Sequence, residues 1–295
     1  MTIPGPGEFP RLILITLILL VMGASLDALS EEEHEHEHTH EWLHFSHPLI
    51  TESPTPDTKI RLDYFFLDAD GEVEDEELGE EGEGPSKFKE STIRLILEYA
   101  FTRNISIEAG IPYTFLNVDG GPNENNFNNI ELAVKLASFA LEQYGVVLGG
   151  GMALGLPTGN DSKGIGSDNI VELEPFADFG VKIHDFQVIG FLALGFPVNQ
   201  KGDQNEGDEL GYTLSMLYHL GSVVEILLEF DGETVLNGEE DGESVLNIDP
   251  GIKFAPFKSK DLKFGFGAGF PLTNDKEFEY RLIGSVFYHM PYLNL

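Results

Sequence analysis

Residues 209–219 read Glu-Leu-Gly-Tyr-Thr-Leu-Ser-Met-Leu-Tyr-His, and this stretch decides the fold class. Every even position from Leu210 to Tyr218 is large and apolar, whereas most odd positions are small or polar. Successive side chains of a β-strand point to opposite faces, so a period of two predicts a strand with one apolar face and one polar face. The stretch therefore indicates a β-strand rather than a helix.

The same alternation recurs along the chain from Lys59 onward. Twelve segments of about 9–13 residues carry it, and this length is sufficient to cross a bilayer on a slant. The segments lie at 59–68, 89–101, 105–115, 127–138, 144–156, 168–182, 186–197, 209–220, 222–231, 242–256, 260–272 and 277–289. The sequence thus predicts an all-β fold.

The connections between these segments alternate between short and long. Those that follow even-numbered segments are tight turns such as His184-Asp185, whereas most of those that follow odd-numbered segments are longer, glycine-rich and acidic. Outer-membrane barrels have this asymmetry, with brief periplasmic turns and extended outer loops. We therefore predict a twelve-stranded antiparallel up-and-down transmembrane β-barrel, in which an even strand count leaves both termini on the periplasmic side.

Composition excludes several classes of protein. The chain has 17 Lys and Arg against 51 Asp and Glu, a formal net charge of −34, so it has too few cations to bind a nucleic-acid backbone. It contains no cysteine, which removes disulfides, thiolate metal sites and cysteine nucleophiles. A soluble sandwich or barrel remains the alternative, but its apolar faces would have to fill the wide interior of twelve long strands. Seven tyrosines on the apolar faces, mostly toward segment ends, favour the membrane barrel.

The amino-terminal region predicts export. An apolar run from Leu12 to Met22 follows Arg11 and precedes the small residues 23–25, the pattern of a cleaved secretory signal. The run is shorter than the roughly 20 residues of a spanning helix, which disfavours the alternative of a retained anchor. We predict a signal peptide over 1–25, a largely irregular His-rich periplasmic segment over 26–58 and the barrel over 59–295. The predicted location is the outer membrane of a Gram-negative bacterium.

Charged side chains occupy the faces opposite the apolar ones and predict the lining of the barrel lumen. The candidates are Arg61, Asp63, Arg94, Glu98, Glu108, Glu131, Lys135, Glu172, Glu174, Asp178, Lys182, Glu225, Glu229, Lys253 and Arg281. Opposite charges on neighbouring strands can pair, which would give a closed, rigid interior. The other interpretation is a narrow polar conduit with a cation bias. Twelve strands lie between filled and open barrels, so both remain possible.

The His-rich segment offers a candidate metal site. His34, His36, His38 and His40 would project to one side of an extended chain, about 7 Å apart. Neutral imidazoles in this arrangement suit a divalent metal such as zinc, with the intervening glutamates as oxygen donors. The alternative is a solvated tail whose composition has no such role. No other cofactor is indicated.

Four segments end on a Gly-x-Pro motif, at residues 110–112, 155–157, 195–197 and 269–271. Proline cannot donate to a strand ladder, so it suits the exit of a strand into a loop. With the stretch Ser46-His47-Pro48-Leu49-Ile50-Thr51-Glu52-Ser53-Pro54 and the turn Tyr99-Ala100-Phe101-Thr102-Arg103-Asn104, this pattern resembles the family of outer-membrane barrels named as transporters of the meta-pathway of phenol degradation. The resemblance covers about residues 45–295. It implies a twelve-stranded barrel that takes up small, often hydrophobic, compounds, and it implies no catalytic residues.

Three functions follow from these patterns. The leading hypothesis is an outer-membrane barrel that passes or binds a small hydrophobic or aromatic solute. Its expected partners are outer-membrane lipid and that solute, and no nucleic acid is expected. The second is a metal-binding outer-membrane protein that uses the His-rich segment, and the third is a closed structural barrel. An enzyme is not expected. Ser215 and His219 share a strand face, but four residues along a strand span about 13 Å, too far for a nucleophile and its base.

Overall fold

The computed structural model describes residues 43–71, 86–198, 207–238, 241–256 and 261–290. The predicted signal peptide and the candidate metal ligands His34, His36, His38 and His40 lie outside these residues. Among the described residues, no helix is long and apolar enough to cross a membrane.

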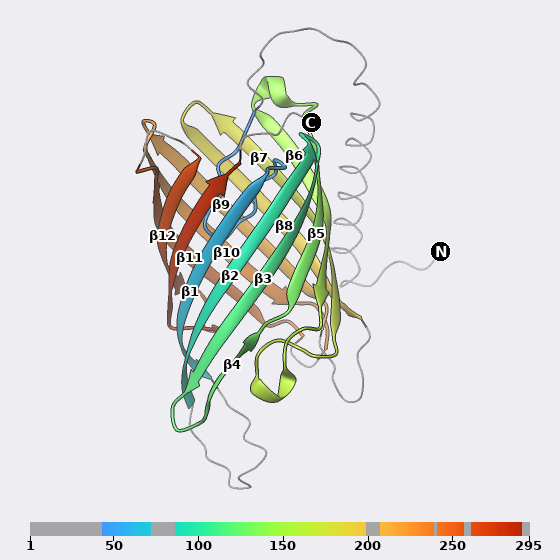
Figure 1. Cartoon of the computed structure of the whole chain (residues 1–295), viewed down its shortest axis with the longest axis vertical. Coiled ribbons are helices and arrows are strands. Elements are labelled where there is room, and N and C mark those ends of the chain that lie inside the picture. The colour runs from blue at the N-terminus through green and yellow to red at the C-terminus, as the bar shows by residue number, and fades with distance from the viewer. Residues whose placement is uncertain (1–42, 72–85, 199–206, 239–240, 257–260, 291–295) are drawn as a thin grey trace, which may run out of the picture.

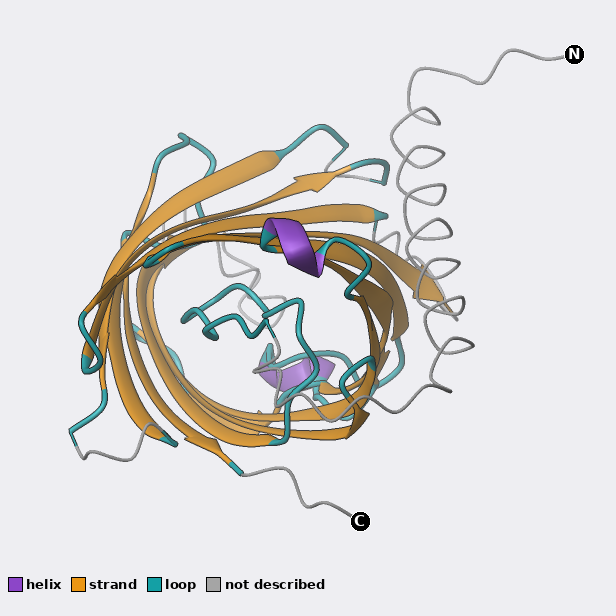
Figure 2. Ribbon diagram, turned by 90° about the horizontal axis from the view of Figure 1, so that it is seen from above, coloured by secondary structure: helices purple, strands orange, loops and turns teal. Residues whose placement is uncertain are grey.

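The strands of the described part form a closed ring (Figures 1 and 2). Each strand pairs antiparallel with its neighbours in the chain, and β1 closes the ring by pairing with β13 from Lys59–His289 to Asp68–Tyr280. The strands of the ring are β1 Lys59–Gly71, β2 Ser86–Thr102, β3 Ile105–Val118, β5 Ile130–Ser138, β6 Val146–Leu156, β7 Val171–Ile183, β8 Phe186–Val198, β9 Glu209–Leu220, β10 Val224–Val235, β11 Ser244–Phe254, β12 Leu262–Pro271 and β13 Tyr280–His289. The twelve-stranded antiparallel barrel predicted from the alternation is confirmed.

Three short elements were not predicted. Strand β4, Asn123–Phe127, pairs only with β3 and extends it into a hairpin beyond the ring. Its sequence, Asn-Glu-Asn-Asn-Phe, lacks alternating large apolar residues and therefore carries no strand signal. The 3₁₀ turns η1, Glu142–Tyr144, and η2, Asp161–Lys163, lie in the connections that follow β5 and β6.

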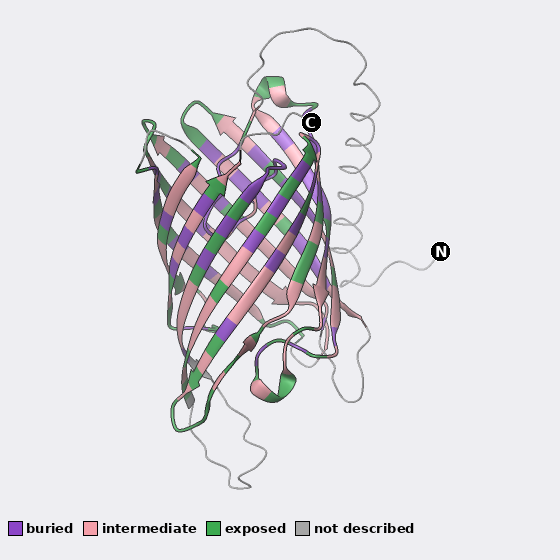
Figure 3. Cartoon of the chain, in the orientation of Figure 1, coloured by how far each residue is buried: buried purple, intermediate pink, exposed green. Residues whose placement is uncertain are grey.

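Side-chain burial alternates along the strands, as the bands of colour in Figure 3 show. On β1, Arg61 is fully buried, whereas the exposed fractions of its neighbours Ile60 and Leu62 are 38% and 45%. Large apolar side chains of other strands, such as Leu214 and Phe266, are likewise exposed. The apolar faces therefore point outward, and charged side chains such as Arg61 and Lys253 point inward. This is the reverse of a soluble barrel.

The two ends of the barrel differ in their connections. Turns as short as His184–Asp185 and 221–223 join the strands at one end, which we call the short-turn end. At the other, long-loop end, the connections include 119–129, with β4, and 157–170, with η2. At the short-turn end, His184 adopts a left-handed backbone conformation with φ 55°. The alternation of short and long connections in the sequence thus corresponds to the two rims of the barrel.

Residues 43–58, which we call the inner segment, lie inside the barrel as irregular chain (Figure 2). Phe45 and Leu49 are fully buried in one apolar cluster with side chains from six strands, including Ile189, Leu217 and Phe287. The sequence predicts that these residues belong to a periplasmic segment over 26–58, whereas the structure places residues 43–58 inside the barrel. A twelve-stranded wall encloses more space than its own side chains fill. Phe45 and Leu49 are therefore buried inside the barrel and removed from contact with water.

Glycines in the barrel wall make room for the inner segment. A Cβ atom on Gly251 or Gly267 would lie 2.8 or 2.9 Å from Leu49 Cδ1, and one on Gly265 would overlap Leu49 Cδ2. Gly265 and Gly267 of β12 are thus glycines because Leu49 occupies the space of their side chains. Gly180 serves Phe45 similarly, since a Cβ there would lie 2.6 Å from the ring.

We expect Gly265→Leu to lower the free energy of unfolding by about 1–3 kcal/mol, the usual cost of overpacking, because the new side chain competes with Leu49. Urea titration of the protein in phospholipid vesicles measures the change. Gly284→Leu on β13 is the matched control, since a Cβ there has no heavy atom within 4 Å. Equal stability of the two variants would contradict this account of the β12 glycines.

Candidate functional site

The interior of the barrel is divided by the inner segment, whose backbone is bound by the wall. Glu229 on β10 accepts backbone hydrogen bonds from Leu49 (2.7 Å), Ile50 (3.2 Å) and Thr51 (3.0 Å). The hydroxyl of Ser215 on β9 also donates to Glu229, at 2.7 Å. A buried carboxylate needs such donors, and irregular chain has free N–H groups to supply them.

A second group of wall residues binds the segment at Ser46. The Ser46 backbone N–H donates to Gln187 Oε1 on β8 (2.9 Å), and its hydroxyl donates to Glu225 Oε2 on β10 (2.5 Å). Lys253 on β11 donates to Glu225 (2.9 Å), to the Ser46 hydroxyl (2.7 Å) and to the His47 carbonyl (2.5 Å). Strands β8, β10 and β11 therefore hold the segment at Ser46 and His47.

Glu52, one of the two carboxylates of the inner segment, lies in a cluster of cations. Its carboxylate lies 3.3 Å from Lys59 Nζ on β1, 3.5 Å from Lys135 Nζ on β5 and 3.7 Å from Arg61 Nη1 on β1. Burial alone would raise the pKa of Glu52, but these three cations hold it well below the usual range. Arg61 also donates to the Leu49 carbonyl. The contact is therefore ionic at neutral pH.

Lys59 joins this cluster to the neighbouring strands and to a histidine of the segment. Its ammonium lies 2.8 Å from Glu98 on β2, 3.2 Å from Glu108 on β3 and 3.2 Å from His47 Nδ1. Complete burial, reinforced by the charge of Lys59, holds the pKa of His47 well below the usual range. The His47 ring is consequently neutral and accepts the hydrogen bond from Lys59.

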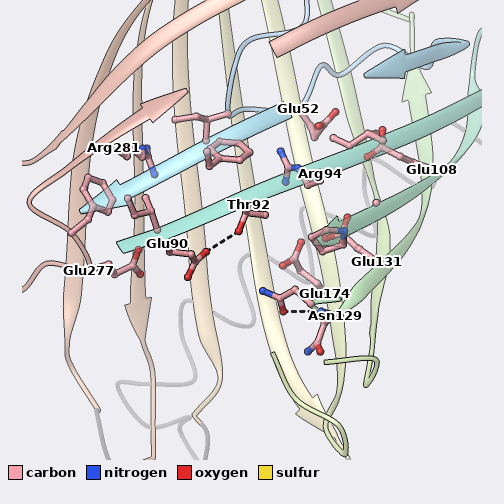
Figure 4. Close-up of a pocket in the computed structure, with 18 of the residues that line it drawn as sticks. Glu52, Glu90, Thr92, Arg94, Glu108, Asn129, Glu131, Glu174, Glu277 and Arg281 are labelled. Carbon is pink, nitrogen blue, oxygen red and sulfur yellow. Dashed lines mark hydrogen bonds between the residues drawn. The ribbon is translucent and has the colours of Figure 1, made fainter. Parts of the chain in front are cut away.

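One cavity of about 500 Å³ lies between the inner segment and the long-loop end of the barrel (Figure 4). We call it the outer cavity. Its polar lining consists of six glutamates and two arginines, together with a threonine and two asparagines. These residues are Glu52, Glu90, Thr92, Arg94, Glu108, Asn128, Asn129, Glu131, Glu174, Glu277 and Arg281. Phe65, Phe191 and Phe278 add aromatic surface. The outer cavity thus combines an excess of carboxyl groups with apolar contact area.

A second cavity of about 490 Å³, the inner cavity, lies toward the short-turn end. Leu43, His44 and Ser46 of the segment line it, as Ile50 and Glu52 line the outer cavity. Its charged and titratable wall residues are Lys182, His184, Asp185, His219, Glu225 and Lys263. The inner segment is therefore the partition between two polar spaces of similar size.

The fifteen charged residues predicted to line the lumen occupy different places in the interior. Nine are buried, namely Arg61, Asp63, Glu98, Glu108, Lys135, Asp178, Glu225, Glu229 and Lys253. Five are half-buried, namely Arg94, Glu172, Glu174, Lys182 and Arg281, while Glu131 is exposed within the outer cavity. Six of the fifteen hydrogen-bond or ion-pair with the inner segment, namely Arg61, Glu98, Lys135, Glu225, Glu229 and Lys253.

Several residues of the site were not predicted from sequence. Glu52 and Ser46 belong to a segment without any periodicity, and Gln187 and Ser215 are uncharged, so none stands out in a search for charged inward positions. Only the prolines at 48, 54 and 56 and the apolar residues between them indicate ordered irregular chain.

Two solved structures resemble this one. An outer membrane channel from Pseudomonas putida F1 has a TM-score of 0.61 at 13% sequence identity, and the match covers 87% of this chain and 100% of that chain. The NanC porin has a TM-score of 0.52 at 9% identity, over 80% of this chain and 100% of that chain. No family model and no curated protein matches the sequence. The likeness shows the fold alone, a twelve-stranded barrel like those of outer-membrane channels. The narrower resemblance to the phenol meta-pathway family stays a prediction.

We expect Glu52→Gln to lower the free energy of unfolding by about 3 kcal/mol, because it removes one carboxylate partner from three buried cations. The pKa of Glu52 is lowered on folding, so this contribution is complete above about pH 4.5 and is lost as the pH falls through the lowered value. The difference between wild type and variant should thus stay constant from about pH 7 to pH 5 and shrink in stronger acid.

Urea titrations in vesicles across this pH range measure the difference. Glu124→Gln is the control, since Glu124 forms an ion pair with Lys163 in which both side chains are about one-third exposed. Such surface pairs contribute at most about 1 kcal/mol. A Glu52→Gln variant as stable as the control would contradict the role assigned to Glu52.

Proposed function

We propose that this protein is an outer-membrane channel for small solutes, held closed by its inner segment in the state described. The observation that carries the proposal is the partition of the lumen: two polar cavities lie on either side of a segment of irregular chain. Polar contacts and the burial of Phe45 and Leu49 hold that segment in place. Irregular chain inside a barrel can leave without breaking the wall, because its hydrogen bonds are not part of the strand ladders.

The outward-facing apolar side chains support a membrane location. A closed ring satisfies its backbone hydrogen bonds internally, as hydrocarbon requires, and its outer surface exposes side chains such as Leu214, Ile226 and Phe266. Large contiguous apolar surfaces are rare on soluble monomers. The cleaved signal over 1–25 remains part of this proposal as the route of export.

The outer cavity supports a solute class. Its glutamates favour solutes that carry positive charge or hydrogen-bond donors, while Phe65, Phe191 and Phe278 favour an apolar or aromatic part. A volume of about 500 Å³ is within the usual range for small-molecule sites. We propose a small, partly aromatic compound as the solute, and the predicted lumen residues Arg94, Glu108, Glu131, Glu174 and Arg281 as its contacts.

A closed structural barrel is the competing interpretation, and the ion pairs of Lys59 and Glu52 favour it. These buried contacts tie the inner segment to β1 and β5 and would keep the lumen shut permanently if they never exchange. The two functions differ in one measurable property, the passage of ions once the segment is released.

The membrane location predicts a dependence on depth for charges on the outer face. We expect Leu214→Arg, in the middle of β9, to lower the free energy of unfolding in phospholipid vesicles by about 2–4 kcal/mol. Leu220→Arg, at the short-turn end of the same strand, should cost at most about 1 kcal/mol. Both leucines are exposed, by 38% and 48%, so burial does not separate them. Urea titration in vesicles measures both, and equal effects would argue against a lipid-facing strand.

Release of the segment tests the channel directly. Glu229→Gln replaces an acceptor oxygen with an N–H donor facing the donor groups of Leu49 or Thr51, so we expect it to displace the segment and to increase single-channel conductance in planar bilayers. Glu124→Gln, outside the barrel interior, should behave as wild type.

An introduced thiol reports the displacement independently, because the chain has no cysteine. Leu49 is fully buried, so the thiol of Leu49→Cys should react slowly with a maleimide and faster when combined with Glu229→Gln. Faster labelling without any gain in current would show that the segment had moved while the barrel remained impermeable. That result would favour the closed structural barrel.

A further inference from the structure

Three histidines converge on one carboxylate oxygen at the short-turn end of the barrel. Asp57 Oδ2 lies 3.0 Å from His44 Nε2, 3.3 Å from His47 Nε2 and 2.7 Å from His289 Nδ1. The four atoms lie within 4.8 Å of one another. His44, His47 and Asp57 belong to the inner segment, whereas His289 is the last residue of β13. The ring closure places it there, because His289 pairs with Lys59, two residues beyond Asp57.

We propose that this cluster binds one divalent transition-metal ion of the zinc class, with His44, His47, His289 and Asp57 as the ligands. Three imidazole nitrogens and one carboxylate oxygen are a donor set that zinc accepts in tetrahedral geometry. At zinc–ligand distances of about 2.0–2.1 Å, tetrahedral ligand atoms lie about 3.3 Å apart. The distances from Asp57 Oδ2 to the three imidazole nitrogens are 2.7, 3.0 and 3.3 Å, and no two of the four atoms are more than 4.8 Å apart, so side-chain movements can bring them to that spacing.

The surroundings suit a bound ion in two ways. The other carboxylate oxygen of Asp57 accepts the Thr58 N–H at 2.9 Å, and the Asp57 N–H donates to Glu98 at 3.2 Å, so Asp57 Oδ2 is held toward the imidazoles. Such outer contacts orient metal ligands. The His44 side chain is 46% exposed and lines the inner cavity, which provides a route for the ion from the short-turn end.

The hydrogen bond between Lys59 and His47 makes metal binding to the cluster less favourable. A His47 ring bound to metal through Nε2 carries its proton on Nδ1, which lies 3.2 Å from the Lys59 ammonium and accepts from it in the metal-free arrangement. Binding therefore requires Lys59 to give up this contact. Its three carboxylate partners, Glu52, Glu98 and Glu108, remain within 3.3 Å, so the ammonium stays paired.

A bound ion would connect the inner segment to the seam at which the barrel closes. His289 lies on β13, and Asp57 directly precedes Thr58 and the first residue of β1. The site would therefore stabilise the segment inside the barrel, in addition to the contacts made by Glu229 and Glu52. The inference concerns metal binding and does not depend on whether the barrel conducts.

Metal binding to the full-length chain, purified without an added histidine tag, tests the proposal. After chelator treatment, Co²⁺ and Zn²⁺ are titrated into wild type, His289→Ala, His44→Ala and the control His184→Asn. His184 lies at the same end outside the cluster, and asparagine tolerates its left-handed conformation. All four proteins carry His34, His36, His38 and His40, so metal bound there contributes equally to each.

We expect wild type and His184→Asn to bind one more ion per chain than the two cluster variants, or to bind it at least about 10–100-fold more tightly. Loss of a residue that only contacts a metal ligand already lowers metal affinity about 10–100-fold, so loss of a ligand itself should lower it by at least as much. Tetrahedral Co²⁺ absorption should be present in wild type and weakened in both cluster variants. Zn²⁺ should also raise the unfolding temperature of wild type more than that of His289→Ala.

Identical stoichiometry, affinity and Co²⁺ spectra in all four proteins would overturn the proposal. Heat-dependent gel mobility checks that each barrel is folded. If His289→Ala fails this check, His44→Ala decides alone, because His44 is exposed and its replacement leaves the barrel wall intact.

Discussion

Antiparallel pairing between β1 and β13 is the constraint on which the rest of this structure depends. Closing the ring leaves none of its twelve strands with a free edge and divides each of them into an outward and an inward row of side chains. The outward row is apolar. The inward row bears charges, some of which pair with one another, as Lys59 does with Glu98 and Glu108. The inner segment supplies further partners, namely the carboxylate of Glu52 for cations and the backbone N–H groups of residues 49–51 for Glu229.

The inner segment and the wall are complementary in shape as well as in charge. Leu49 packs on the glycines of β11 and β12, while Glu229 on β10 binds the backbone N–H groups of the same residue and its neighbours. Glu52 then reaches the cations of β1 and β5 on another side of the ring. A short stretch of irregular chain thus contacts much of the circumference, and none of these contacts belongs to a strand ladder. This arrangement suits a partition that is stable yet separable from the wall.

The same closure creates proximity between residues far apart in the chain. His289 lies at the end of β13 and meets His44, His47 and Asp57 because β13 returns to the start of β1. His44, His184 and His219 line the inner cavity, whereas carboxyl groups predominate in the outer cavity. The two halves of the lumen therefore offer different chemistry to a solute or an ion, and the inner segment separates them.

The alternation in residues such as 209–219 and the unequal connections were sufficient to predict the closed barrel and its outward and inward faces, because period-two patterning and turn length are local properties of the chain. Charged inward residues such as Arg61, Glu229 and Lys253 could be selected for the same reason. The placement of residues 43–58 could not, since irregular chain has no period and its backbone N–H groups, which bind Glu229, are present in every sequence. The meeting of His289 with Asp57 depends on which strands close the ring, and only the tertiary structure decides that, because the two residues share no local pattern and lie 232 positions apart.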